Sequence, residues 1–367
     1  MRSLAILSVY DSQGIVDKYL SYFGTSLMKA VDELIVVING KVNDEGMTAL
    51  EEITDKILVR DNIGFDAGGY RAAMDTYGKE YILSYDQVII CNDTCFGPFV
   101  PFKEIFAQMD QNSADFWGFQ YVEYDFMSSM GTFFIAFRKN VLNDVYDYLM
   151  RLDIDHMTRS DVVRMVEIGL SQFLLDKKYK YVCYSNTDDY DVYKAPNYCI
   201  RQCGAPLMKK RCFDPIKYHK DNCIDALKYI EANYEYDIEL ILSVIKRKYD
   251  ITYDLEYEYS RVLQTQDIKF HALNSTLEDI NLFVQSDKDV YIYGTGFYGK
   301  LLMERISACV KGFVISDERY TEEYVMNKEV YKYSSIKNDD CKIVVAILDV
   351  DEIKRKLQNR KDVLYLL

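Results

Sequence analysis

The first part of the chain alternates between apolar runs and stretches of helical periodicity. Leu4 to Val9, Glu33 to Ile38 and Lys56 to Val59 are rich in branched apolar residues, which is typical of buried strands. Between these runs, apolar residues recur at helical spacing over Gly14 to Phe23 and Glu45 to Ile53. The alternation predicts an α/β fold in which right-handed crossovers join parallel strands.

Polar residues stand close after each of these predicted strands. Asp11 follows the first strand, Asn39 the second, and Asp61 with Asn62 the third. Ligands of open α/β sheets bind at the edge where the carboxyl ends of parallel strands meet. These side chains therefore predict a ligand crevice at that edge.

A glycine-punctuated polar loop follows the third strand and leads through a helical pattern to a fourth apolar run, Gln87 to Cys91. The loop contributes Asn62, Gly64, Asp66, Gly68 and Gly69. Polar side chains beside a flexible backbone favour contact with a phosphate or sugar, although glycines also build tight turns where no ligand binds.

The fourth run ends at Asn92 and Asp93, again at the carboxyl edge of the predicted sheet. Our hypothesis is that Asp93 holds a divalent metal on a nucleotide diphosphate. The alternative is an acid that caps the turn after the strand.

The same patterns predict further elements, with Glu167 inside the last helix and beside its apolar face. The predicted helices are Phe102 to Met109, Asn140 to Leu152 and Ser160 to Lys177, and the strands are Ala114 to Phe119, Met130 to Phe137 and Tyr179 to Tyr184. Helices of modest polarity are predicted over Lys220 to Tyr249 and Asp254 to Gln285.

The last part of the chain restarts an α/β pattern. A strand at Val290 to Tyr293 leads into GTGFYG, which contains Gly294, Gly296 and Gly299, and Asp317 follows the next strand. Asp317 is 23 residues after Gly294, close to the spacing of about 20 expected for a ribose-binding acid. Nucleotide binding and a purely structural or docking role both remain open for this small module.

Composition narrows the class of protein. The chain has 367 residues, 49% of them apolar, and a formal charge of −14, which disfavours nonspecific binding to nucleic acid or anionic lipid. No run approaches the roughly 20 apolar residues of a spanning helix. Nine scattered cysteines without a tight pair indicate buried thiols in a reducing cytoplasm rather than a zinc site.

Seven sequence blocks between Leu4 and Phe213 carry a resemblance to a known family. In order they are LAILSVYD, ELIVVING, DNIGFDAGGYRAA, VIICNDTCFGP, DFWGF, VEIGLSQFLLDKKY and CGAPLMKKRCF. This part resembles inverting nucleotide-sugar glycosyltransferases of the GT-A fold, and among them the rhamnan synthesis protein F family of bacterial cell-surface polysaccharide enzymes. The resemblance implies a GT-A-like domain over 1–218. The patterns along the rest of the chain predict a helical linker over 219–286 and a Rossmann-like domain over 287–367.

The resemblance also implies roles for residues around the donor. It places Asp11 and Asn39 at the base and ribose of the nucleotide. It places Asn62, Gly64 and Asp66 in a loop that covers the donor.

For metal binding, the resemblance implies Mg²⁺ or Mn²⁺ on Asp93, the last acid of a DxD element. Cys91 replaces the first acid of that element and Asn92 lies between them. A thiol is a poor ligand for these ions, so Asn92 or water is left to complete the site.

For catalysis, the resemblance implies that Glu167 is the base, at the first position of an acid pair whose second member is here Ile168. Lys209, Lys210 or Arg211 would neutralise charge on the leaving diphosphate, although such a basic run is also typical of a solvated face.

The function that we expect is metal-assisted, inverting transfer of a sugar, with rhamnose implied by the resemblance, to a cell-surface polysaccharide or lipid-linked glycan. The expected location is the cytoplasm, with attachment to the inner face of the membrane left open. One alternative is a non-catalytic sugar-nucleotide or glycan-binding subunit, because an acid of the DxD element is missing. An oxidoreductase or epimerase is a weaker alternative, because no Tyr-x-x-x-Lys set follows GTGFYG.

Overall fold

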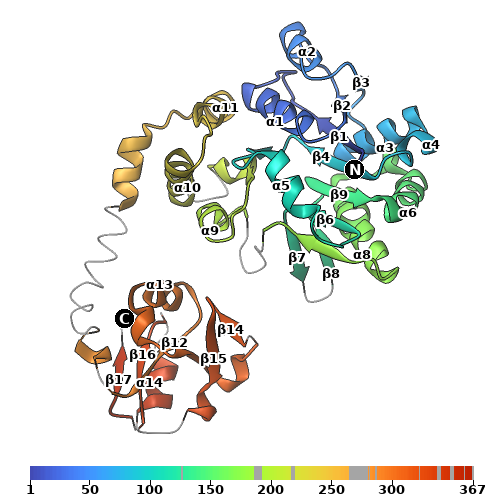
Figure 1. Ribbon diagram of the computed structural model, residues 1–367. Helices are drawn as coiled ribbons and strands as arrows, with labels where there is room; N and C mark the ends of the chain where they lie inside the picture. The colour runs from blue at the N-terminus through green and yellow to red at the C-terminus, as the bar shows by residue number, and fades with distance from the viewer. Residues whose placement is uncertain are drawn as a thin grey trace. The chain divides into compact units, whose positions relative to one another are not determined.

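The computed structural model divides the chain into two compact units, Met1–Val262 and Leu263–Leu367 (Figure 1). It describes residues 1–124, 127–185, 192–215, 220–263, 280, 282–285, 287–321, 323–336, 340–347, 351–358 and 360–365. The boundary between the units falls inside the region 219–286 that the sequence analysis assigned to a linker.

A seven-stranded sheet forms the centre of the first unit, in the order β10-β6-β9-β4-β1-β2-β3. Its strands are β1 (Ser3–Val9), β2 (Glu33–Asn39), β3 (Ile57–Arg60), β4 (Gln87–Asn92), β6 (Phe116–Gly118), β9 (Phe134–Arg138) and β10 (Tyr181–Cys183). β1 pairs in parallel with β2 and β4, and β2 pairs in parallel with β3. Only β9 is antiparallel to its neighbours within this sheet. The predicted α/β class with a parallel sheet is confirmed.

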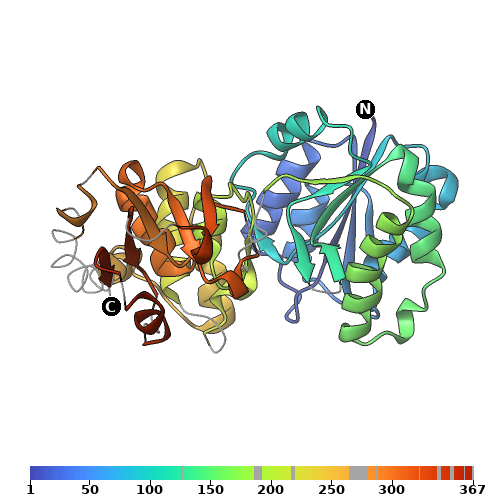
Figure 2. The same ribbon diagram turned by 90° about the horizontal axis from the view of Figure 1, so that it is seen from below.

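Helices cover both faces of this sheet (Figure 2). They include α1 (Lys18–Met28), α2 (Asp44–Glu51), α3 (Phe65–Tyr77), α4 (Lys79–Ile82), α5 (Phe102–Met109) and α6 (Lys139–Met150). Along β1, Ala5 and Leu7 belong to one buried core and Leu4 and Ile6 to the other. Burial on both faces explains why the strands read as continuous apolar runs.

Helix α3 begins earlier than the glycine pattern suggested, so Gly68 and Gly69 lie within the helix and the loop ends at Gly64. Gly64 has φ +71°, and a Cβ on Gly68 would lie 2.1 Å from the carbonyl oxygen of Ile63. A Cβ on Gly69 would lie 2.6 Å from Ser8 Oγ on β1. These glycines therefore let the start of α3 close tightly on the preceding loop and the sheet.

The single helix expected over Ser160 to Lys177 is interrupted in the structure. It consists of α7 (Arg159–Val162), a π-helix η2 (Val163–Ile168) and α8 (Gly169–Asp176). Glu167 lies in the π-helical segment, a rare conformation that is frequent at functional sites.

Three helices between residues 195 and 250 belong to the first unit. They are α9 (Pro196–Arg201), α10 (Lys220–Asn233) and α11 (Glu239–Tyr249), and residues 255–262 of this unit are also helical. Leu227 of α10 and Val244 of α11 pack in the same core as Ala5 and Leu7 of β1. The remainder of the predicted helix Asp254 to Gln285 falls mostly on 264–279, outside the described residues.

Two short strands, one after β4 and one before α10, pair with each other. β5 (Cys95–Phe96) pairs antiparallel with β11 (Met208–Lys209), which leads into the 3-10 turn η3 (Lys210–Phe213). A hairpin of β7 (Tyr121–Tyr124) and β8 (Met127–Met130) was not predicted. In the part of the chain that the structure describes, no helix is long and apolar enough to cross a membrane.

The second unit is a six-stranded sheet in the order β14-β15-β13-β12-β16-β17. Its elements are β12 (Asp289–Tyr293), α13 (Phe297–Ile306), β13 (Gly312–Ile315), β14 (Tyr324–Val325), β15 (Lys328–Lys332), β16 (Cys341–Val345), α14 (Asp351–Leu357) and β17 (Val363–Tyr365). All its strand pairs are parallel except β14 with β15. From β15 to β17 the strands follow the order 3-2-1-4-5 of a Rossmann-type sheet that lacks the sixth strand among the described residues.

Candidate functional site

Asp93, directly after β4, lies in a partly buried ion pair. Lys210 Nζ, at the start of η3, is 2.8 Å from Asp93 Oδ2 and donates a hydrogen bond to the Tyr19 hydroxyl at 2.6 Å. The Tyr19 hydroxyl donates to the Asp93 carbonyl oxygen at 2.9 Å. The two charged side chains are only 14% and 12% exposed, so the pair is shielded from much of the solvent.

Asp11 is paired to α11. Arg247 Nη2 donates to Asp11 Oδ2 at 2.9 Å and also bonds Asp17, and Lys248 Nζ is 3.4 Å from the same Asp11 oxygen. Burial opposes the charge on Asp11, but the hydrogen bonds from Arg247 lower the pKa of Asp11 to about 2. We call Asp11, Asp93, Lys210, Arg247 and Lys248 the ion-pair cluster.

A second group of polar residues meets the end of β4 through Asn92. Asn92 Nδ2 donates to Asp66 Oδ2 at 2.7 Å, and Asn92 Oδ1 accepts from Thr94 Oγ1 at 2.6 Å. Burial raises the pKa of Asp66 despite this hydrogen bond. Asn92 is itself buried, so it holds Asp66 at the strand end rather than facing solvent.

Glu167 belongs electrostatically to this second group. Burial raises the pKa of Glu167, the charge of Asp66 raises it further, and Lys209 opposes both effects. Lys209 Nζ donates to Thr94 Oγ1 at 3.1 Å and lies 3.8 Å from the centre of the Phe133 ring. We call Asp66, Asn92, Glu167 and Lys209 the carboxyl cluster. A carboxyl with a raised pKa is suited to accept a proton near neutral pH.

Two side chains predicted for the donor site, Asn39 and Asn62, do not join these clusters, and neither does Gly64. Asn39 is 2% exposed; it donates to Ser8 Oγ at 2.8 Å and accepts from Arg60 Nη1 at 2.7 Å. Its amide is therefore occupied inside the sheet edge. Asn62 is exposed, one residue before Ile63, whose carbonyl oxygen accepts from Arg60.

Comparison with known proteins identifies the family. The sequence model described as "Rhamnan synthesis protein F" matches residues 34–318, which is 285 of the 367 residues of this chain. This chain belongs to the rhamnan synthesis protein F family. The resemblance seen in the sequence blocks is confirmed.

One curated relative is the uncharacterized protein y4gN of Sinorhizobium fredii, 24% identical over 174 residues. The aligned part covers 46% of this chain and 45% of the relative, so this family member spans about half the length of the curated relative it matches.

Solved structures that are similar to this chain include S. aureus TarS in complex with UDP, which is 12% identical and has a TM-score of 0.32. The match covers 68% of this chain and 72% of that chain. Another is a cytidylyltransferase of Leptospira borgpetersenii, which is 13% identical and has a TM-score of 0.33. The match covers 69% of this chain and 98% of that chain. A third is glucosyl-3-phosphoglycerate synthase of Mycobacterium tuberculosis in complex with Mg²⁺ and UDP, which is 12% identical and has a TM-score of 0.27. The match covers 42% of this chain and 67% of that chain.

The residues of this rhamnan synthesis protein F family member do not fit a divalent ion at Asp93. Cys91 Sγ is buried, 3.8 Å from the Ile6 carbonyl oxygen. No group of three His, Cys, Asp or Glu side chains suited to a metal occurs among the described residues. The Lys210 ammonium already lies 2.8 Å from Asp93 Oδ2, and its positive charge would repel a divalent ion on that carboxylate.

The predicted glycine motif of the second unit forms a tight strand-to-helix turn. Gly294 has φ +109°, and a Cβ on Gly299 would lie 1.9 Å from the Gly294 carbonyl oxygen. Gly296, the N-cap of α13, has open space beside it. Asp317 is exposed after β13 and accepts from the Ser334 backbone N–H at 2.9 Å. The motif therefore forms a tight strand-to-helix turn that needs two of its glycines, and whether it binds a nucleotide stays a prediction.

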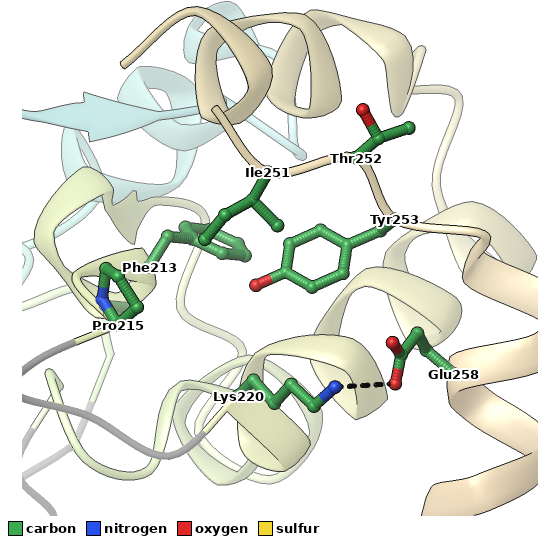
Figure 3. Close-up of a pocket in the computed structure, with 8 residues that line it drawn as sticks. Phe213, Pro215, Lys220, Ile251, Thr252, Tyr253 and Glu258 are labelled. Carbon is green, nitrogen blue, oxygen red and sulfur yellow. Dashed lines mark hydrogen bonds and ion pairs between the residues drawn. The ribbon is translucent and has the colours of Figure 1, made fainter. Parts of the chain in front are cut away.

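A cavity of about 390 Å³ lies at the far end of η3 in the first unit (Figure 3). Phe213, Ile251 and Tyr253 form its apolar lining, and Lys220 pairs with Glu258 at 2.8 Å at its side. Its charged residues are already paired, and none of the predicted site residues lines it. We do not assign it to the site.

Tyr19, Arg247 and Lys248 are site residues that sequence reasoning missed. The basic run Lys246 to Lys248 was visible in the sequence, but nothing local connects it to Asp11, which precedes it by more than 200 residues. Only the packing of α11 on the first unit's core brings the run to the sheet edge.

Proposed function

We propose that the first unit is an inverting glycosyltransferase that moves a sugar from a nucleoside diphosphate donor to a glycan of the cell surface. The observation that carries the proposal is that both clusters meet at the end of β4, the carboxyl cluster through Asn92 and the ion-pair cluster through Asp93. One cluster supplies cations for a leaving diphosphate, and the other supplies a carboxyl with a raised pKa. Membership of the rhamnan synthesis protein F family supports a glycan product and rhamnose as the sugar.

In this mechanism Glu167 takes the proton of the acceptor hydroxyl as its oxygen attacks the anomeric carbon. The bond between that carbon and the diphosphate oxygen breaks, and the diphosphate leaves with the electron pair. Attack from the face opposite the leaving group inverts the configuration in one step, without a covalent intermediate. Lys209 and Lys210 stabilise the charge that develops on the diphosphate.

Asp66 has a supporting role in the proposal. Its negative charge contributes to the raised pKa of Glu167, and its hydrogen bond from Asn92 fixes it at the strand end. A buried polar group at that position is suited to orient a hydroxyl of the donor sugar. The family resemblance also implies Mg²⁺ or Mn²⁺, but because the ligands at Asp93 do not fit, no step is assigned to a metal.

The partners in this proposal are a nucleotide-sugar donor and a glycan or lipid-linked glycan acceptor, met in the cytoplasm or at the inner face of the membrane. The competing function is a non-catalytic subunit that binds sugar nucleotides or glycans. The transferase and a sugar-nucleotide-binding subunit both require donor binding, but only the transferase releases nucleoside diphosphate.

The test incubates the full chain with UDP-, GDP- and dTDP-sugars, rhamnose included, and measures the release of nucleoside diphosphate. Thermal unfolding with the same compounds measures binding, since a ligand at about a hundred times its Kd adds roughly 2.7 kcal/mol of stability. Release that is lost in Glu167→Gln, with binding retained, supports the transferase. Binding without release, with or without glycan acceptors, favours the binding subunit and contradicts the proposal.

A further inference from the structure

We propose that Lys210, assisted by Lys248, binds the diphosphate of the donor in place of a divalent metal. This inference rests on the proposed function, because it concerns the same donor site. It goes against the metal dependence that the family resemblance implies.

The first support is the position of the Lys210 ammonium. It lies 2.8 Å from Asp93 Oδ2, the carboxylate to which the DxD comparison assigns the ion. The Tyr19 hydroxyl is a second partner of the ammonium, at 2.6 Å, and the Lys210 side chain is only 14% exposed. A fixed, shielded cation therefore already stands beside the carboxylate that would otherwise hold the metal.

The second support is a further cation from another element. Lys248 Nζ, on α11, is 3.4 Å from Asp11 Oδ2. Burial lowers the pKa of Lys248, and the charge of Lys210 lowers it further, so the two ammonium groups lie within electrostatic reach of each other. A diphosphate carries several negative charges and relieves the repulsion between two such groups when it binds both.

Asp93 acts in this arrangement as a positioning residue. Its carboxylate and Tyr19 hold Lys210 at the sheet edge, and its negative charge competes with the donor for that lysine. A metal ligand would behave in the opposite way, because it attracts the donor through the ion. The two readings therefore predict opposite effects of the same substitution.

The experiment measures the Kd of UDP, GDP and dTDP by isothermal titration of the full chain, once with EDTA and once with Mg²⁺ or Mn²⁺. We expect the tightest-binding nucleotide to have the same Kd within about threefold under all conditions. Lys210→Met should raise that Kd about tenfold or more, and Lys210→Arg should restore most of the binding, because a charge-assisted hydrogen bond is lost and then replaced. Asp93→Asn should leave binding unchanged or tighter.

The controls separate binding from folding. Lys29→Met removes an exposed lysine at the end of α1 and should leave the Kd unchanged. The double variant Asp93→Asn/Lys210→Met avoids an unpaired buried charge, so a raised Kd in a chain that unfolds at the normal temperature still reports on Lys210.

Binding that appears only with metal and disappears in Asp93→Asn would overturn the inference and leave the proposed function standing. An unchanged Kd in a folded Lys210→Met chain would also overturn it. If no nucleotide binds with or without metal, the inference and the proposed function fail together.

Discussion

The ion-pair cluster and the carboxyl cluster occupy the same sheet edge, yet their acids behave differently. In the ion-pair cluster, hydrogen bonds from Arg247 hold the pKa of Asp11 at about 2. In the carboxyl cluster, burial raises the pKa of Asp66 and of Glu167, and neither lies in an ion pair with a described residue. The difference follows from the cation partner: Asp11, which accepts hydrogen bonds from Arg247, stays ionised, whereas Asp66 and Glu167, which lack such a partner among the described residues, hold a proton more readily.

The largest effect that would test this contrast is on turnover in Glu167→Gln. Loss of the base should lower kcat by a factor of about 10² or more while the donor Kd stays nearly constant. Initial rates and isothermal titration measure the two quantities. The matched control is Glu51→Gln, an exposed position on α2. Normal turnover in Glu167→Gln would remove Glu167 as the base.

The pH dependence of kcat sharpens the contrast. Because the pKa of Glu167 is raised and a base must be deprotonated, kcat should rise with pH through a midpoint above about 4.3, the ordinary glutamate value. Below that midpoint the rate should fall about tenfold per pH unit. A rate that is constant from pH 4.5 to 8 would contradict the assignment, since Glu167 would then be ionised throughout.

Gly68→Ala tests whether the glycines at the start of α3 are needed to position Asp66 of the carboxyl cluster. The added Cβ would meet the Ile63 carbonyl oxygen, so we expect a loss of about 2–3 kcal/mol in the unfolding free energy and a displaced Asp66. Denaturant unfolding measures the loss. In the control, Gly24→Ala, the Cβ would lie 3.1 Å from Ile53 Cδ1 and 3.5 Å from Ile53 Cγ2, with no backbone atom in its way, and a smaller loss is expected. Equal stability of both variants would contradict the tight closure of α3.

The smallest effect concerns the ion-pair cluster alone. Arg247→Met should lower the unfolding free energy by about 1–2 kcal/mol at neutral pH, with Lys246→Met, exposed on the same helix, as control. The pKa of Asp11 is lowered on folding, so its stabilisation is present above its unfolded pKa of about 3.9. The difference between wild type and variant should therefore shrink as pH falls from about 4 towards 2. A difference independent of pH would show that Arg247 acts through packing only.

Local pattern in the sequence determined the architecture around the site. The apolar runs predicted β1, β2 and β4 to within a residue or two, and the helical spacing predicted α5 over Phe102–Met109. The same pattern placed Asp93 and Glu167 next to buried elements, and the sequence blocks identified the family. These features can be predicted from the sequence because burial of one face of a strand or helix makes apolar residues recur at short, regular spacing.

Tertiary structure alone decided what the site residues do. The π-helical turn at Glu167 and the burial of Asn39 leave no short-range signal. The partner of Asp93 is 117 residues away in sequence and that of Asp11 is 236 residues away. A carboxylate's charge depends on the cations and the solvent within a few ångströms, and such neighbours come from long-range packing that local periodicity does not encode.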